Sequence, residues 1–161
     1  MADYPLLFRI THAVRCSNFE AIVVTDGRAL MAFDDGEWWC HGVEPGGLTE
    51  NGPAPSVAYE KFRSSFRHVL DDLAEESGSF EAFQRDARTF FNADAVEERH
   101  WHEALTVLRD MQDSEIDASF RGMQRLAPRP SVMWFRDLVE HGREPLGKPE
   151  QAEMVVLSKA A

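Results

Sequence analysis

The sequence predicts an α+β protein: a small antiparallel β-meander of three to four strands packed against a long helix, followed by two further helices and an irregular C-terminal segment. Three observations lead to this fold class. Short apolar segments separated by turn dipeptides fill residues 6–43. A Gly- and Pro-rich corner follows over residues 44–55. Residues 56–77 then carry apolar side chains at helical spacing.

Four apolar runs are predicted to form the strands of the meander. They are residues 6–14, 19–25, 28–33 and 37–43. In the first run the alternation places Phe8, Ile10, His12 and Val14 on one side and Arg9 and Thr11 on the other. Asp26-Gly27 is a strong hairpin signal, so a tight turn is expected between the second and third runs. Asp34-Asp35-Gly36 predicts the next turn.

The long helix is predicted over residues 56–77 from the periodicity of its apolar face. That face consists of Ala58, Phe62, Phe66, Val69, Leu70 and Leu73. Ser56 stands where an N-cap is expected, and Gly78 where a left-handed C-cap is expected. Burial of the Phe and Leu side chains should contribute about 1.5–3 kcal/mol each. Burial of Phe62 and Phe66 is therefore the central expectation for this fold.

Two shorter helices are expected to extend the sheet-and-helix core of residues 4–77. Ser79 can cap the first, and Asp94 begins a capping box with Glu97 for the second, so the extension covers residues 79–111. Residues 112–161 are predicted to be irregular, apart from a short strand or helix over residues 131–139 and a strand over residues 154–157. The whole chain, 1–161, is expected to form a single domain.

Composition narrows the classes of protein to which the chain can belong. The formal net charge of −11 argues against a general nucleic-acid-binding protein, which needs cations to replace the counterions of phosphates. No apolar run approaches the roughly 20 residues of a membrane helix. The N-terminus lacks the basic start of a signal peptide, so a cytoplasmic protein is expected. Cys16 and Cys40 are too few for a disulfide framework.

No catalytic signature and no cofactor site are predicted, and the candidate metal sites are weak. His100 and His102 are two residues apart on a helix and therefore point in different directions. Glu98 and His102 share a helix face, but two ligands are fewer than the three or four that zinc takes from a protein. Cysteines and histidines from neighbouring strands could form a zinc site, although the spacing matches no compact zinc motif. These residues are His12, Cys16, Cys40 and His41.

Three groups of residues are candidates for binding a partner. The first is the acidic C-terminal end of the long helix, which is expected either to receive a basic protein or to be simply solvated: Asp71, Asp72, Glu75 and Glu76. The second is a set of arginines among aromatic residues, expected to bind an anion or to dock on the protein's own acidic helices: Arg121, Arg125, Arg129 and Arg136. The third is the pair Trp38 and Trp39, of which one is expected to face the core. The other is expected either to be a contact residue or to lie under one of the two shorter helices.

The first half of the chain resembles the HicB-like antitoxin family. The matching residues are 19–33 for a central hairpin, 43–52 (VEPGGLTENG) for the corner, and 57–60 (VAYE) onward for the helix. The resemblance implies a sheet-and-helix module that binds a compact basic toxin that cleaves RNA. Residues 79–161 lack the DNA-binding pattern found in that family.

The sequence therefore favours a non-enzymatic protein-binding module, expected to neutralise a small basic toxin and to form a homodimer through an edge strand. Two other interpretations stay open. One is a small-ligand-binding protein or an enzyme that uses a cleft between the sheet and the C-terminal helices. The other is an orphan accessory protein without a toxin.

Overall fold

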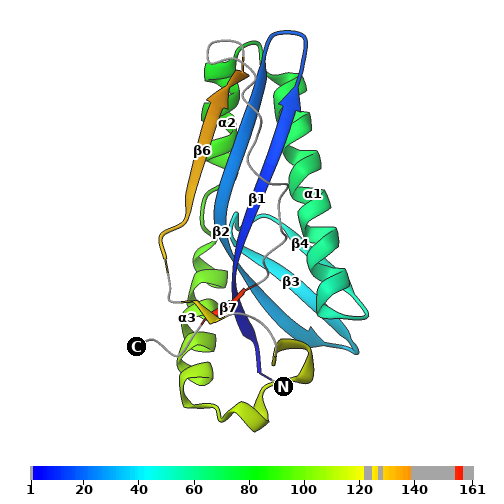
Figure 1. Cartoon of the computed structure of the whole chain (residues 1–161), viewed down its shortest axis with the longest axis vertical. Helices are drawn as coiled ribbons and strands as arrows, with labels where there is room; N and C mark the ends of the chain where they lie inside the picture. The colour runs from blue at the N-terminus through cyan, green and yellow to red at the C-terminus, as the bar shows by residue number, and fades with distance from the viewer. Residues whose placement is uncertain (1, 122–124, 127–128, 139–154, 158–161) are drawn as a thin grey trace.

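The computed structural model describes residues 2–121, 125–126, 129–138 and 155–157. It confirms the predicted α+β fold class, with a mainly antiparallel sheet backed by one long helix (Figure 1). The strands are β1 (Tyr4–Arg15), β2 (Glu20–Asp34), β3 (Glu37–Glu44), β4 (Thr49–Gly52), β5 (Arg125–Leu126), β6 (Val132–Asp137) and β7 (Val155–Leu157). The α-helices are α1 (Pro55–Glu76), α2 (Phe80–Phe90) and α3 (Ala95–Asp110), and two 3-10 turns follow, η1 (Asp113–Glu115) and η2 (Ala118–Phe120).

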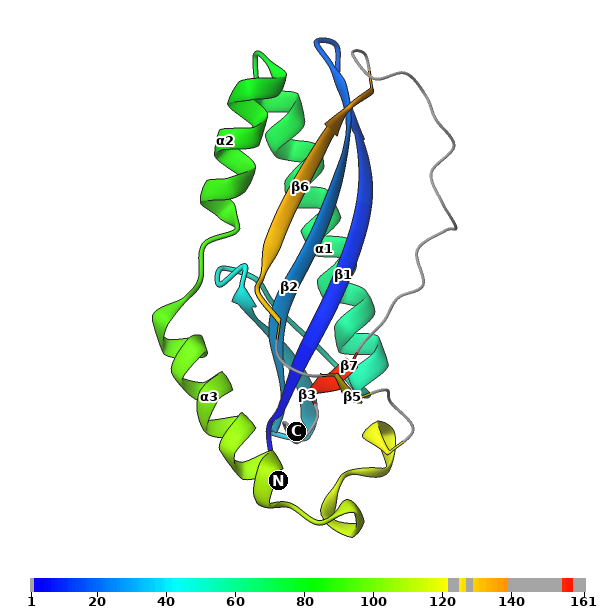
Figure 2. The same cartoon turned by 60° about the vertical axis from the view of Figure 1, so that its left-hand side comes forward.

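The long strand β2 pairs with three neighbours rather than two. β1 occupies one edge of β2 along its length, from Tyr4 opposite Met31 to Arg15 opposite Glu20. The other edge is shared, because β3 pairs with residues 28–34 and β6 pairs with residues 21–26. We call the point where β3 and β6 separate, at Asp26, Gly27 and Arg28, the junction. Figure 2 shows β6 beside the upper part of β2 and β3 beside its lower part.

The hairpin predicted at Asp26-Gly27 is wrong, because β2 runs through these residues without turning. A type I′ turn needs positive φ angles, and in the described chain these occur only at Asp35 (49°) and Gly36 (83°), where the next predicted turn does form. Gly27 instead accommodates a close approach between strands. A Cβ atom there would lie 2.3 Å from Cζ of Phe8 and 2.5 Å from the carbonyl oxygen of Glu44. Tertiary packing thus overrides the local turn signal.

Helix α1 covers one face of the sheet and forms the main core, as predicted. Phe62 and Phe66 are fully buried. Both rings meet the ring of Phe8 edge-on, with centroids 5.3 and 6.2 Å apart. Figure 1 shows α1 and α2 together behind β1, β2 and β6.

Both predicted caps of α1 are wrong, although its bounds differ from the predicted 56–77 by one residue at each end, and the N-caps predicted for the next two helices are confirmed. The helix begins at Pro55 after the N-cap Ala54, because proline at the first position needs no N–H partner, so Ser56 lies inside the helix. It ends at Glu76, and the next residue, Ser77, is the C-cap in place of a left-handed Gly78. Ser77 has an extended backbone, and its hydroxyl donates to the carbonyl of Leu73. Ser79 caps α2 and Asp94 caps α3 through side-chain bonds to backbone N–H groups.

Helix α3 packs on the opposite face of the sheet and forms a second, smaller core. Leu7, Leu30 and Val43 of the strands meet Trp101 and Ala104 of the helix there. The strands predicted within residues 131–139 and 154–157 correspond to β6 and β7. Residues 139–154 lie outside the described residues. Among those described, no helix is long and apolar enough to cross a membrane.

The close approach at the junction predicts that Gly27→Ala destabilises the protein. The added methyl group must push aside both the Phe8 ring and the Glu44 backbone. We expect a loss of about 1–3 kcal/mol in the free energy of unfolding, measured by urea denaturation. The matched control is Gly47→Ala, because nothing lies within 4 Å of a Cβ atom at that position. Equal stability of the two variants would contradict this account of the junction.

Candidate functional site

Charged residues gather on the outer face of the sheet at the junction. Arg9 of β1 lies directly opposite Asp26 of β2. Its Nε and Nη2 each donate to one carboxylate oxygen of Asp26 at 2.7 Å. Such a two-bond arginine–carboxylate pair is stronger than a single contact and fixes both side chains. The pair explains how an almost fully buried carboxylate can occupy the middle of a strand.

Arg28 connects four elements at the junction. Its Nη2 donates to Glu44 at the end of β3 and to Glu98 of α3, each at 3.0 Å. Its Nε donates to the hydroxyl of Ser131, just before β6, at 3.2 Å. The guanidinium also lies 5.0 Å from the centre of the Trp101 ring, within cation–π range. The side chain is 13% exposed, so these bonds are shielded from solvent.

Arg129 is the third arginine of this network and the one held most loosely. Its Nη2 lies 3.6 Å from the Asp26 carboxylate, beyond hydrogen-bond distance. Its side chain is 36% exposed, against 7% for that of Asp26. Asp26 already accepts two short bonds from Arg9, so its longer ion pair with Arg129 adds little. Of the three arginines in the network, Arg129 can therefore turn toward another anion with the smallest loss of existing contacts.

A cavity of about 360 Å³ opens beside these groups, and we call it the junction cavity. It is lined by Arg28, Glu44, Trp101, Arg129, Pro130 and Ser131. Nε of Arg129 and Nε1 of Trp101 are buried and have no hydrogen-bond partner among the described residues. An unpaired buried donor costs about 1–3 kcal/mol. A cavity with a few converging polar groups is the usual form of a small-molecule site.

Above the junction, the outer face of the sheet carries an exposed tryptophan. Trp134 of β6 lies opposite Val24 of β2 and is 48% exposed. The Arg9 guanidinium lies 5.8 Å from the centre of its ring. Figure 1 shows this face toward the viewer, with α1 and α2 on the far side and α3 lower down. We call the surface formed by Arg9, Trp134 and Arg136 the open sheet face.

The acidic residues predicted as a partner site lie at the end of α1, on the other side of the sheet. Asp71 lies 2.7 Å from Nε2 of His12 in β1. Asp72, Glu75 and Glu76 are exposed, and the last turn of α1 has no basic residue. The carboxylates thus remain next to the negative end of the helix dipole.

Neither the tryptophan pair nor the set of four arginines predicted from the sequence forms a single surface in the structure. Trp38 is buried against Phe120, whereas Trp39 is half-buried and stacks on His41. Arg136 lies within β6, opposite Ile22 of β2, whereas Arg129 precedes that strand and lies at the junction. Arg121 donates to the backbone carbonyls of Ile116 and Ser114, in the segment that follows α3, and does not line the junction cavity. Arg125 lies in β5, and its side chain is outside the described part of the structure.

The weak metal and thiol candidates are not assembled. Cys40 points into the main core, while His41, the next residue of β3, points to the opposite face. Burial, with a smaller effect from Glu50, raises the pKa of the Cys40 thiol, so it is protonated and a poor nucleophile. The described residues contain no group of three or more His, Cys, Asp or Glu side chains that could hold a metal ion.

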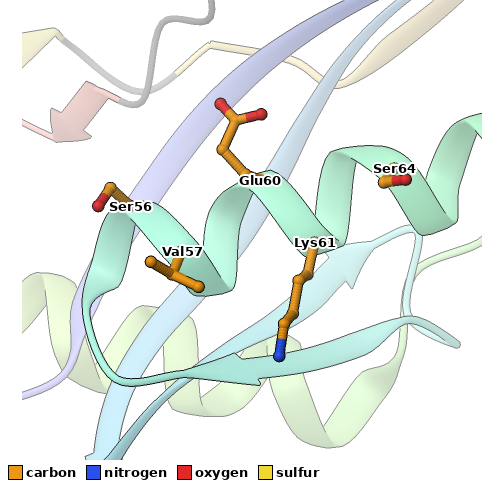
Figure 3. Close-up of a pocket in the computed structure, with 5 residues that line it drawn as sticks. All are labelled: Ser56, Val57, Glu60, Lys61 and Ser64. Carbon is orange, nitrogen blue, oxygen red and sulfur yellow. The ribbon is translucent and has the colours of Figure 1, made fainter.

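A second surface hollow runs along the N-terminal half of α1 (Figure 3). It is lined by Ser56, Val57, Glu60, Lys61 and Ser64. Figure 3 shows the side chains of Glu60 and Lys61 pointing in opposite directions. Their charges therefore do not converge on a common ligand, and the junction remains the better candidate.

Sequence analysis missed the junction network because its residues come from separate elements. Arg9, Arg28, Glu44 and Glu98 are brought together only by the register of three strands and the placement of α3. One signal was available: a charged Arg9 in the middle of an apolar strand needs an outward-facing partner. Comparison with known proteins adds no further assignment, since no family model, curated protein or solved structure matches this chain.

The geometry predicts strong coupling between Arg9 and Asp26. In a double-mutant cycle with Arg9→Ala and Asp26→Ala, urea denaturation should give a coupling free energy of about 1–2 kcal/mol. The value is limited because half of the Arg9 side chain is exposed, so water screens part of the attraction. The exposed neighbours Arg85 and Asp86 form a 3.1 Å pair and serve as the control. Their coupling should stay below about 0.5 kcal/mol. Additive effects at Arg9 and Asp26 would rule out the proposed pairing.

Proposed function

We propose that this protein is a non-enzymatic protein-binding module whose partner docks on the open sheet face. The observation that supports it is the half-exposed Trp134 on a sheet surface that none of the described helices covers. Tryptophan and arginine are the residues most enriched at the energetic centres of protein interfaces. Trp134 lies beside Arg9, so both types are present in one place.

The open sheet face is also rigid before any partner arrives. Arg9 is fixed by its two bonds to Asp26, and Trp134 projects from a strand that is paired along its length with β2. Side chains that are already ordered lose little conformational entropy on binding. This preorganisation favours a binding surface over a solvated sheet face.

The HicB-like resemblance supports a more specific version of the proposal. In that version the module is an antitoxin, and its partner is a small basic protein. The exposed Asp72, Glu75 and Glu76 at the end of α1 would supply a second, acidic contact. A homodimer belongs to the same proposal, because β4 is the outermost strand at one end of the sheet and is open to pairing there.

A second candidate function is that of a small-ligand-binding protein. The junction cavity supports it, because it lies between the sheet and α3 and contains two buried N–H groups that no described residue accepts from. The two functions use neighbouring but different surfaces. They can therefore be tested separately.

Partner capture tests the protein-binding proposal. The tagged full chain should retain a stoichiometric protein from a lysate of its own host, and Trp134→Ala should reduce the recovered amount about tenfold or more, because the central anchor is lost. Val96→Ala is the matched control, since Val96 is 46% exposed but lies on α3. Quantitative mass spectrometry measures the partner in each eluate.

The same capture tests the antitoxin version with a second variant. Asp72→Asn, Glu75→Gln and Glu76→Gln combined should weaken retention of a basic partner and make it less sensitive to salt. Retention by Trp134→Ala equal to that of Val96→Ala would overturn docking on the open sheet face. If the triple variant retained the partner as well as the unmodified protein does, the proposed contact at the acidic end of α1 would be contradicted.

A further inference from the structure

We infer that the junction cavity binds a small zwitterion of the amino-acid type, with its carboxylate held by Arg129 and its ammonium group held by Glu44. The inference names a ligand class for the second candidate function and rests on it. Both residues line the cavity, whose volume is about 360 Å³. That volume lies at the small end of the range for small-molecule sites, roughly 300–1,000 Å³.

The carboxylate end is assigned to Arg129 because this arginine has the weakest attachment within the protein. Arg9 occupies both oxygens of Asp26 at 2.7 Å, while Arg129 stays 3.6 Å away. A partly exposed guanidinium can turn toward a ligand and form the two-bond pair that planar carboxylates favour. The unbonded N–H groups of Arg129 and Trp101 give the same region a surplus of donors.

The ammonium end is assigned to Glu44 because the two carboxylates beside Arg28 share one guanidinium group. Glu44 and Glu98 both accept from the same Nη2 of Arg28, so one positive charge serves two carboxylates. Glu44 lines the cavity, whereas Glu98 does not. An ammonium group beside Glu44 would balance the second negative charge and use its free acceptor positions.

The summed charge of the network selects a neutral ligand over an anion. Three arginines face three carboxylates, so their charges cancel: Arg9, Arg28 and Arg129 against Asp26, Glu44 and Glu98. A zwitterion preserves this balance, whereas phosphate would add negative charge close to Glu44 and Asp26. Pro130 and the ring of Trp101 provide an apolar wall, which suits a short aliphatic side chain.

Isothermal titration calorimetry on the full chain tests the inference, with individual L-amino acids added up to about 10 mM. At least one aliphatic amino acid should bind with a Kd below about 1 mM. The carboxylic acid that lacks its amino group, the amine that lacks its carboxylate, and inorganic phosphate should each bind about tenfold more weakly or worse.

Variants test the assignment of each end. Arg129→Leu should weaken binding of the amino acid and of the carboxylic acid alike, and Arg129→Lys should restore part of the affinity. Glu44→Gln should weaken binding of the amino acid about tenfold but leave the affinity for the carboxylic acid unchanged. Arg15→Gln is the control, because Arg15 is 70% exposed and pairs only loosely with Glu20. Circular dichroism and urea denaturation verify that each variant is folded.

Each contrary result has a distinct meaning. If phosphate or the carboxylic acid bound as tightly as every amino acid, the assignment of a zwitterion would be wrong, although the cavity would still be a ligand site. Binding unaffected by Arg129→Leu would place the ligand elsewhere. Absence of binding by all of these compounds would remove both the inference and the second candidate function.

Discussion

The arrangement of this protein depends on β2 continuing straight through Asp26, Gly27 and Arg28. β1 pairs with β2 along one edge, and β3 and β6 must divide the other edge between them. Where they separate, the chains can approach only because Gly27 has no side chain: the Phe8 ring fills the core side and the Glu44 carbonyl lies against the strand edge. The separation leaves a gap on the outer face, and the junction cavity lies in it.

The charged residues of the junction follow from the same constraint. A gap between strands exposes polar groups that a continuous sheet would cover, so arginine and carboxylate side chains fill it in pairs. Arg28 then connects β2 to α3 and to the start of β6. Because α3 packs only on the lower part of the outer face, Trp134 remains exposed above it. The cavity and the open sheet face are therefore neighbouring consequences of one strand arrangement.

The sequence alone was sufficient for the elements whose signals are local. The spacing of Phe62 and Phe66 predicted α1 and its buried face, and Ser79 and Asp94 predicted the starts of α2 and α3. Asp26-Gly27 was misread, because its turn propensity yields to pairing with β1. The site could not be predicted, since Arg9, Glu44 and Glu98 meet only after strand register and helix placement are set.

Native-state hydrogen exchange of the β2 backbone tests the central claim most directly. If β2 is continuous, the amides of Thr25–Arg28 that bond to β1 should exchange only on global unfolding, with the same free energy as those of Val23 and Leu30. The amides of the true turn at Asp35 and Gly36 should exchange far faster. Rapid exchange at Asp26 and Gly27, comparable with that at Asp35 and Gly36, would show a turn there and contradict the account.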